Sequence, residues 1–131
     1  MLDVSTPESR MVCSFLREAA HLARRIQSGM ALMGLTKSDF SPVTVADFAI
    51  QALAGKRLSE HFPGMLLLAE EDSRELTTTP EGKKILEVSV HFLSKILGEV
   101  TESQVCAWID RGTAESGSCF WTLDPIDGTK G

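Results

Sequence analysis

The first half of the chain has the residue spacing of two helices. Apolar positions recur every three or four residues between residues 9 and 33, which predicts an amphipathic helix that ends at Gly34. After a polar loop, Thr44 has the character of an N-cap, and Asp47 three residues later completes a capping-box pattern. We therefore expect a second helix from Thr44 to about residue 61.

Two short apolar runs in the second half are expected to be buried strands. Residues 65–69 lie between a Pro-Gly pair and three acids, and residues 119–123 run directly into Asp124. Between them, Thr79-Pro80-Glu81 marks the start of a helix with an apolar side, and residues 105–109 fit a further short helix or strand. Helices before and after short apolar strands indicate an α/β or α+β layered domain.

Composition limits the range of functions. The 131 residues, of which 43% are apolar and 24% charged, suit one folded domain over 1–131. Thirteen basic and eighteen acidic residues leave a net charge of −5, which argues against a protein that binds a nucleic acid polymer. The net charge does not argue against small phosphorylated substrates, because acidic sites recruit divalent cations that bind phosphate.

We find no targeting signal and no membrane-spanning segment in the sequence. The longest unbroken apolar run, 65–69, is far shorter than the ~20 residues of a membrane span. Cys13, Cys106 and Cys119 are widely spaced without a zinc-ligand pattern, and we interpret them as buried structural thiols rather than a redox device. We expect a soluble intracellular protein with no membrane partner, cytoplasmic, with plastid and mitochondrion as alternatives.

Each expected strand ends in carboxylates. Glu70 and Glu71 follow the first strand, and Asp124 and Asp127 follow the second. Ligand sites of α/β sheets form beyond the carboxyl ends of strands, and clustered carboxylates suit a divalent cation such as Mg²⁺. The plainer interpretations are a solvated acidic loop after the first strand and a capping role for Asp47.

The run from Asp124 to Thr129 also fits a turn, because Pro125 fixes φ and Gly128 permits unusual backbone angles. A turn alone requires neither two acids nor a threonine. The Gly128-Thr129 step would open a helix whose backbone N–H groups favour an anion. Metal ligands beside an anion site predict a phosphatase.

These residues carry a family resemblance. Asp124-Pro125-Ile126-Asp127-Gly128-Thr129, preceded by Trp121-Thr122-Leu123, resembles the signature of the lithium-sensitive, magnesium-dependent inositol monophosphatase superfamily. Upstream segments agree in order and spacing, namely Lys37-Ser38-Asp39, Ser41-Pro42-Val43-Thr44-Val45-Ala46-Asp47 and Ala69-Glu70-Glu71-Asp72-Ser73. Lys130-Gly131 favours the plant-type 3′(2′),5′-bisphosphate nucleotidase branch. The resemblance implies the N-terminal part of an αβαβα sandwich, truncated before the C-terminal lobe.

The resemblance also implies a role for each site residue. Glu70 would bind a first Mg²⁺, Asp124 would bridge two ions, and Asp127 would bind the second. Ile126 would coordinate through its backbone carbonyl, Asp47 and Thr129 would orient and deprotonate the attacking water, and the amides of Gly128 and Thr129 would hold phosphate oxygens. Glu71 is a candidate for a third, weaker ion site, and Lys37 and Asp39 are peripheral.

The implied reaction removes the 3′-phosphate of adenosine 3′,5′-bisphosphate to give AMP and phosphate, with its sulfated relative and inositol 1,4-bisphosphate as further substrates. Family members run to well over twice this length, so we expect an N-terminal fragment that is weakly active or inactive and whose oligomeric state is open. Two alternatives stay open: an inositol mono- or polyphosphate phosphatase, and a non-enzymatic module that binds metal or a homologous chain.

Overall fold

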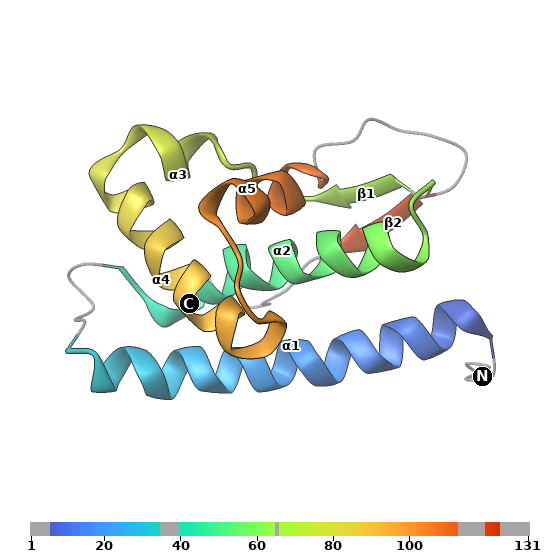
Figure 1. The fold of residues 1–131 in the computed structure, drawn as a ribbon, viewed down its shortest axis with the longest axis horizontal. Coiled ribbons are helices and arrows are strands. Elements are labelled where there is room, and N and C mark those ends of the chain that lie inside the picture. The colour runs from blue at the N-terminus through green and yellow to red at the C-terminus, as the bar shows by residue number, and fades with distance from the viewer. Residues whose placement is uncertain (1–5, 35–39, 65, 113–119, 124–131) are drawn as a thin grey trace.

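The computed structural model describes residues 6–34, 40–64, 66–112 and 120–123. Its elements, in chain order, are α1 (Pro7–Leu32), α2 (Pro42–His61), β1 (Leu66–Ala69), α3 (Arg74–Thr78), α4 (Pro80–Leu97), α5 (Glu102–Asp110) and β2 (Phe120–Leu123). Figure 1 shows α2 between α1 on one side and α5 with the strands on the other. No helix in the described ranges has the length and apolar character needed to cross a membrane.

The start of α2 corrects the sequence prediction. The N-cap is Ser41, whose side chain accepts a hydrogen bond from the Thr44 amide at 3.1 Å, and the helix begins at Pro42. Proline suits the first helical position because its φ is already helical and it lacks an amide hydrogen that would need a partner there. Thr44 is therefore not the cap, and Asp47 lies in the helix body rather than in a capping box.

The other helix starts follow local signals. Thr79 caps α4 by accepting a hydrogen bond from the Gly82 amide at 2.9 Å, with Pro80 in the first turn, as predicted. The segment 105–109, which fitted a helix or a strand, is helical within α5, and Thr101 and Gln104 form its capping box. The five-residue α3 was not predicted, because so short a helix has no periodic apolar pattern.

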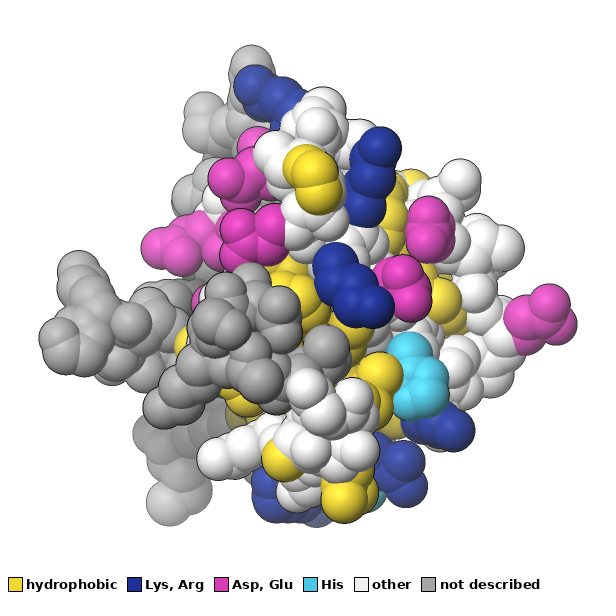
Figure 2. All heavy atoms as spheres, turned by 90° about the vertical axis from the view of Figure 1, so that its left-hand side faces the viewer, with side chains coloured by type: hydrophobic (Ala, Val, Ile, Leu, Met, Phe, Trp, Pro, Cys, Tyr) yellow, Lys and Arg dark blue, Asp and Glu magenta, His cyan; other side chains and the backbone are white. Residues whose placement is uncertain are grey.

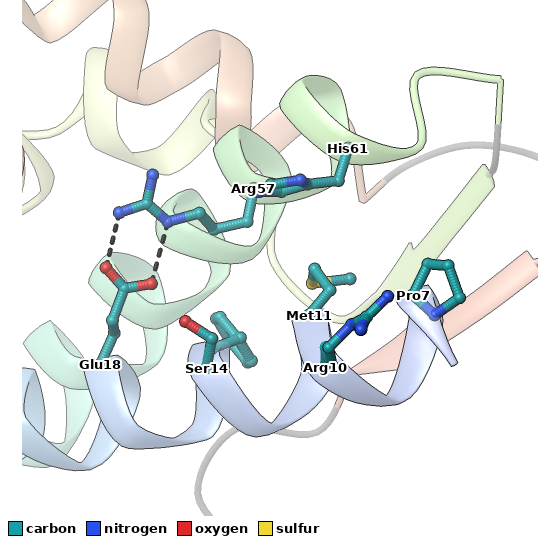
Figure 3. A pocket seen from close by; sticks show the side chains of 8 residues that line it. Pro7, Arg10, Met11, Ser14, Glu18, Arg57 and His61 are labelled. Carbon is teal, nitrogen blue, oxygen red and sulfur yellow. Dashed lines mark hydrogen bonds and ion pairs between the residues drawn. The ribbon is translucent and has the colours of Figure 1, made fainter. Parts of the chain in front are cut away.

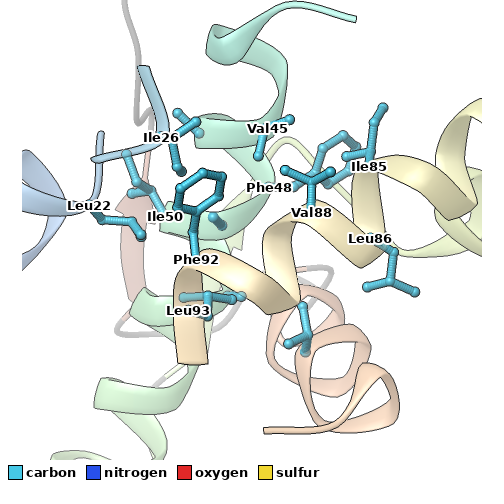
Figure 4. Packing of buried hydrophobic residues seen from close by; sticks show 14 of the residues in the cluster. Leu22, Ile26, Val45, Phe48, Ile50, Ile85, Leu86, Val88, Phe92 and Leu93 are labelled. Atoms are coloured by element: carbon cyan, nitrogen blue, oxygen red, sulfur yellow. The ribbon is translucent and has the colours of Figure 1, made fainter. Parts of the chain in front are cut away.

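The core surrounds α2. Eleven of its residues are buried, so this helix is covered on nearly all sides, whereas α1 buries one stripe that includes Leu22, Ile26 and Met30. Phe92 of α4 belongs to the same buried cluster as these side chains and lies close to Ile26 in Figure 4. The helices around α2 therefore hold it in place, and any side chain that it directs toward the strands has a defined position.

Two parallel strands complete the described fold. β1 pairs with β2 in the register Leu66↔Phe120, Leu67↔Trp121, Leu68↔Thr122 and Ala69↔Leu123. Both expected strands are therefore confirmed, apart from positions 65 and 119, which lie outside the described residues. The described chain is mostly helical, with this strand pair as its sheet. The αβαβα sandwich extends beyond what these residues establish and stays a prediction.

Candidate active site

The two strands end at the same edge of the sheet. Ala69 lies opposite Leu123, and these two residues immediately precede Glu70 and Asp124 in the sequence. The parallel register thus brings together the two strand ends from which the predicted carboxylates follow. Of the predicted site, the structure describes Asp47, Glu70 and Glu71. The remaining predicted residues, Lys37, Asp39, Asp124, Ile126, Asp127, Gly128 and Thr129, lie outside the described residues.

The loop after β1 concentrates negative charge. Glu70 is exposed and Glu71 is half-buried. Burial raises the pKa of Glu71 above its ordinary value, and the nearby charges of Glu70, Glu75 and Asp72 raise it further. A bound cation would relieve both the repulsion and the desolvation, and an all-oxygen donor set is what Mg²⁺ prefers. The chemistry of this loop therefore fits the predicted ion.

Asp72 has a structural task in this loop. Its Oδ1 accepts a hydrogen bond of 2.8 Å from the Arg74 amide, and its Oδ2 lies 3.8 Å from the Arg74 guanidinium. Such a turn, in which an aspartate accepts from the backbone two residues on, shapes the entry into α3. The three consecutive acids are thus not equivalent. The Asp72 carboxylate binds Arg74, so Glu70 and Glu71 are the better candidates to bind a ligand.

A buried amide on α2 holds the acidic loop. The Gln51 side chain is 0% exposed; its Nε2 donates to the Glu71 carbonyl at 2.7 Å and to the Ile109 carbonyl at 2.8 Å. Its Oε1 accepts from the Glu71 amide at 3.1 Å. These bonds join three elements of the chain at one point. Sequence analysis missed Gln51, and the available signal was one polar residue within the apolar run 48–54.

Asp47 precedes Gln51 by four residues on α2. Residues at this spacing share a helix face. Asp47 therefore lies on the same face of α2 as Gln51, and this face is directed toward the acidic loop. Asp47 is half-buried as a residue and its Oδ1 is buried. A carboxylate so placed suits a proton acceptor beside a polar site.

A second contact links the loop to α5. Asp110 accepts two hydrogen bonds from Ser73, one from its amide at 2.7 Å and one from its hydroxyl at 2.6 Å. Cys106, one turn earlier on α5, is half-buried; burial raises the pKa of its thiol, and the charge of Asp110 adds to the effect. Cys13 and Cys106 are both free and only partly buried, so the predicted buried thiols are an overstatement for these two.

The described residues hold only part of the predicted metal site. Within 6–34, 40–64, 66–112 and 120–123, no three His, Cys, Asp or Glu side chains are grouped to hold an ion. Glu70 and Glu71, the candidate for a third ion site, belong to these ranges, whereas Asp124, Ile126 and Asp127 follow β2 in the sequence. The metal site therefore stays a prediction.

A separate cavity of about 380 Å³ lies between α1 and α2 (Figure 3). Its lining includes Arg57, which donates to Glu18 through Nε at 2.9 Å and through a terminal nitrogen at 2.5 Å. The hydrogen bonds that Arg57 donates to Glu18 raise the pKa of Arg57, so the guanidinium stays charged. No predicted site residue lines this cavity. It carries an ion pair that joins α1 to α2.

Surface charge is mixed where the molecule is seen from the α3 and α4 end. Figure 2 shows acidic and basic side chains interspersed on that face, with apolar groups between them. Among the described side chains there, no continuous basic surface forms.

Comparison with known proteins identifies the family. The inositol monophosphatase family matches residues 4–131, and the chain belongs to that family. The 3′(2′),5′-bisphosphate nucleotidase 2 of Candida albicans is 40% identical over 110 residues, which cover 74% of this chain and 30% of the relative. The 3′(2′),5′-bisphosphate nucleotidase of Schizosaccharomyces pombe is 36% identical over 138 aligned positions, 95% of this chain and 39% of the relative.

A plant relative shows the same relation. The 3′(2′),5′-bisphosphate nucleotidase of Oryza sativa is 35% identical over 127 residues, covering 86% of this chain and 35% of the relative. The chain thus spans between 30% and 39% of the length of these three relatives. The resemblance to the inositol monophosphatase superfamily, and within it to the bisphosphate nucleotidases, is confirmed.

Proposed function

We propose that this chain supplies part of the active site of a Mg²⁺-dependent phosphatase of the 3′(2′),5′-bisphosphate nucleotidase type. The substrate is adenosine 3′,5′-bisphosphate, and the products are AMP and phosphate. One observation carries the proposal: the parallel register of β1 and β2 makes Ala69 and Leu123 neighbours, directly before Glu70 and Asp124. The names of the relatives support the choice of substrate.

The proposed ion ligands all offer oxygen. Glu70 and Asp127 would each hold one ion, Asp124 would be shared by both, and Ile126 would contribute its backbone carbonyl. When bound, Mg²⁺ neutralises the charge of the phosphate oxygens and makes water more acidic. The acidic loop fits this role because the pKa of Glu71 is already raised by burial and by its acidic neighbours, a situation that a cation relieves.

Residues of this chain also bind the phosphate of the substrate and accept the proton of the attacking water. The backbone amides of Gly128 and Thr129 hold phosphate oxygens. Asp47 orients a water molecule together with the Thr129 hydroxyl and accepts its proton as the oxygen attacks phosphorus. The bond between phosphorus and the 3′-oxygen breaks, and the leaving oxygen takes up a proton to give the ribose hydroxyl. Water is thus consumed once for each phosphate released.

Phosphate release tests this proposal. The 131-residue chain is assayed with adenosine 3′,5′-bisphosphate, AMP and inositol 1-phosphate, each with Mg²⁺ and with EDTA. A chimera in which this chain replaces the matching segment of the S. pombe relative is assayed in parallel. We expect Mg²⁺-dependent release from the bisphosphate, fast in the chimera and slow in the isolated chain, and little release from AMP.

Matched variants identify the residues responsible. We expect Asp47→Asn to lower the rate at least ~100-fold, the lower range for loss of a general base, and Glu99→Gln, an exposed acid after α4, to leave the rate unchanged. An unchanged rate in Asp47→Asn, or no release by either the isolated chain or the chimera, contradicts the proposal. Faster release from inositol 1-phosphate would favour an inositol phosphatase instead. Concentration-dependent self-association with no release by the isolated chain or the chimera would favour a non-enzymatic module.

A further inference from the structure

Gln51 occupies an environment that normally excludes a primary amide. It is 0% exposed on α2, and its neighbours in the helix, Ile50 and Ala52, are buried apolar residues. Burying an amide without hydrogen bonds costs on the order of 1–3 kcal/mol. A glutamine is therefore found in a core where its side-chain amide has hydrogen-bond partners. Three hydrogen bonds to Gln51 are present, and all of them go to backbone atoms outside α2.

The bonds to Glu71 resemble the pairing between two strands. The Gln51 amide both donates to the Glu71 carbonyl, at 2.7 Å, and accepts from the Glu71 amide, at 3.1 Å. A side chain thus takes the place of a neighbouring strand just beyond the end of β1. Because both backbone groups of Glu71 are held, the peptide planes on either side of its Cα are fixed relative to α2.

Gly112 and Ile109 extend the network to the end of α5. The Ile109 carbonyl accepts from Gln51 at 2.8 Å and from the Gly112 amide at 3.0 Å, and the Gly112 carbonyl accepts from the Ala69 amide at 3.0 Å. A Cβ on Gly112 would lie 2.7 Å from Gln51 Nε2 and 2.8 Å from the Ala69 Cβ. Both distances are too short, so this position requires glycine.

We propose that Gln51 is a positioning residue for the proposed phosphatase site. It sets the acidic loop after β1 at a fixed distance from Asp47, one turn away on the same face of α2. The inference rests on the proposed function, because positioning matters where Glu70 holds an ion and Asp47 acts on the water that attacks the phosphate. Residues that orient ligands typically change metal affinity by about 10–100-fold when they are replaced.

Two variants disrupt the network from different sides. Gln51→Met keeps a side chain of similar length without amide hydrogen bonds, and Gly112→Ala forces a methyl group against the amide. Leu93→Ala is the control, because Leu93 is fully buried in α4 and its truncation lowers stability by about 2–5 kcal/mol without touching the network. Thermal unfolding confirms that each variant is folded at the assay temperature.

The first measurement is Mg²⁺ affinity by titration calorimetry with Mg²⁺ alone. We expect at least ~10-fold weaker binding in Gln51→Met and Gly112→Ala, and unchanged binding in Leu93→Ala despite its lower stability. Unchanged affinity in both network variants would overturn the inference. A purely structural role would move the unfolding temperature and leave the affinity of the folded chain alone.

The second measurement is amide hydrogen exchange at Glu71, which needs no metal. We expect the Glu71 amide to be protected in the wild type and in Leu93→Ala. In Gln51→Met it should exchange at least ~10-fold faster, because the Glu71 amide loses its acceptor, Gln51 Oε1, at 3.1 Å. Equal exchange in the wild type and Gln51→Met would overturn the positioning role. If the wild type shows this protection but neither it nor the chimera binds Mg²⁺, the proposed function fails while the network around Gln51 stands.

Discussion

Replacing Gly55 by alanine tests the closest approach between two helices. Gly55 is buried on α2, where a Cβ would lie 2.2 Å from the Trp108 carbonyl oxygen and 2.9 Å from its carbonyl carbon on α5. These are backbone atoms, so no side-chain rotation relieves the overlap. α2 and α5 must move apart, and their packing must loosen.

The cost follows from two opposing effects. Overpacking of a tight core contact costs roughly 3 kcal/mol, at the upper end of the usual range because backbone must shift. Alanine recovers about 1 kcal/mol through its better helix propensity. The net loss is about 2 kcal/mol in the free energy of unfolding, which lowers the Tm of a chain of this size by roughly 8 °C.

Urea and thermal unfolding followed by circular dichroism measure this effect. Gly64→Ala is the matched control, since Gly64 is exposed and has no atom within 4 Å of a Cβ. We expect that control to be neutral or stabilising by up to about 1 kcal/mol, because alanine restricts the unfolded chain. A Gly55→Ala variant as stable as Gly64→Ala would refute the close contact between α2 and α5.

Two further predictions concern the helix surfaces. A double-mutant cycle with Glu18→Gln and Arg57→Gln should give a coupling energy of about 1 kcal/mol, because the bidentate pair is roughly three-quarters buried, with side-chain exposures of 24% and 23%. Measured by urea unfolding, the coupling should fall in 1 M salt, and zero coupling at low salt would contradict the pair. Cys106 should react with iodoacetamide at pH 8 more slowly in the folded chain than in the unfolded chain, because burial and Asp110 raise the pKa of its thiol. The neutral thiol is the favoured form in the fold, so stability should decline as the pH rises through the unfolded pKa of this cysteine; equal alkylation rates, read by peptide mass spectrometry, would be inconsistent with the raised pKa.

Local sequence signals predicted most of the helices and both strands because the determining interactions are short-range. The apolar stripe of α1 and the Thr79-Pro80 start of α4 each act within a turn or two of the chain. At α2 the prediction of Thr44 as the cap was wrong, and Ser41 is the cap. Pro42 decides between them in favour of Ser41, because proline fits the first helical position.

Local sequence signals could not predict the hydrogen-bond network around Gln51. Its partners Glu71 and Ile109 are 20 and 58 residues away in the sequence, and both contribute backbone atoms that every residue type carries. A lone polar residue within the apolar run 48–54 marks Gln51, but composition and spacing do not reveal which backbone atoms it contacts. The acids Glu70 and Glu71 were found because their residue type indicates the chemistry, whereas Gln51 is defined by where the fold places its amide.

The central claim is that the strand ends after Ala69 and Leu123 form one metal site. An NMR titration of the ¹⁵N-labelled chain with Mg²⁺ tests it most directly, with Glu70→Gln as the comparison. We expect the amide signals of residues 70–71, 124 and 126–129 to shift together along one saturation curve, and Glu70→Gln to weaken the whole response. Shifts confined to one of the two segments, or the absence of any saturable shift, would contradict a shared site.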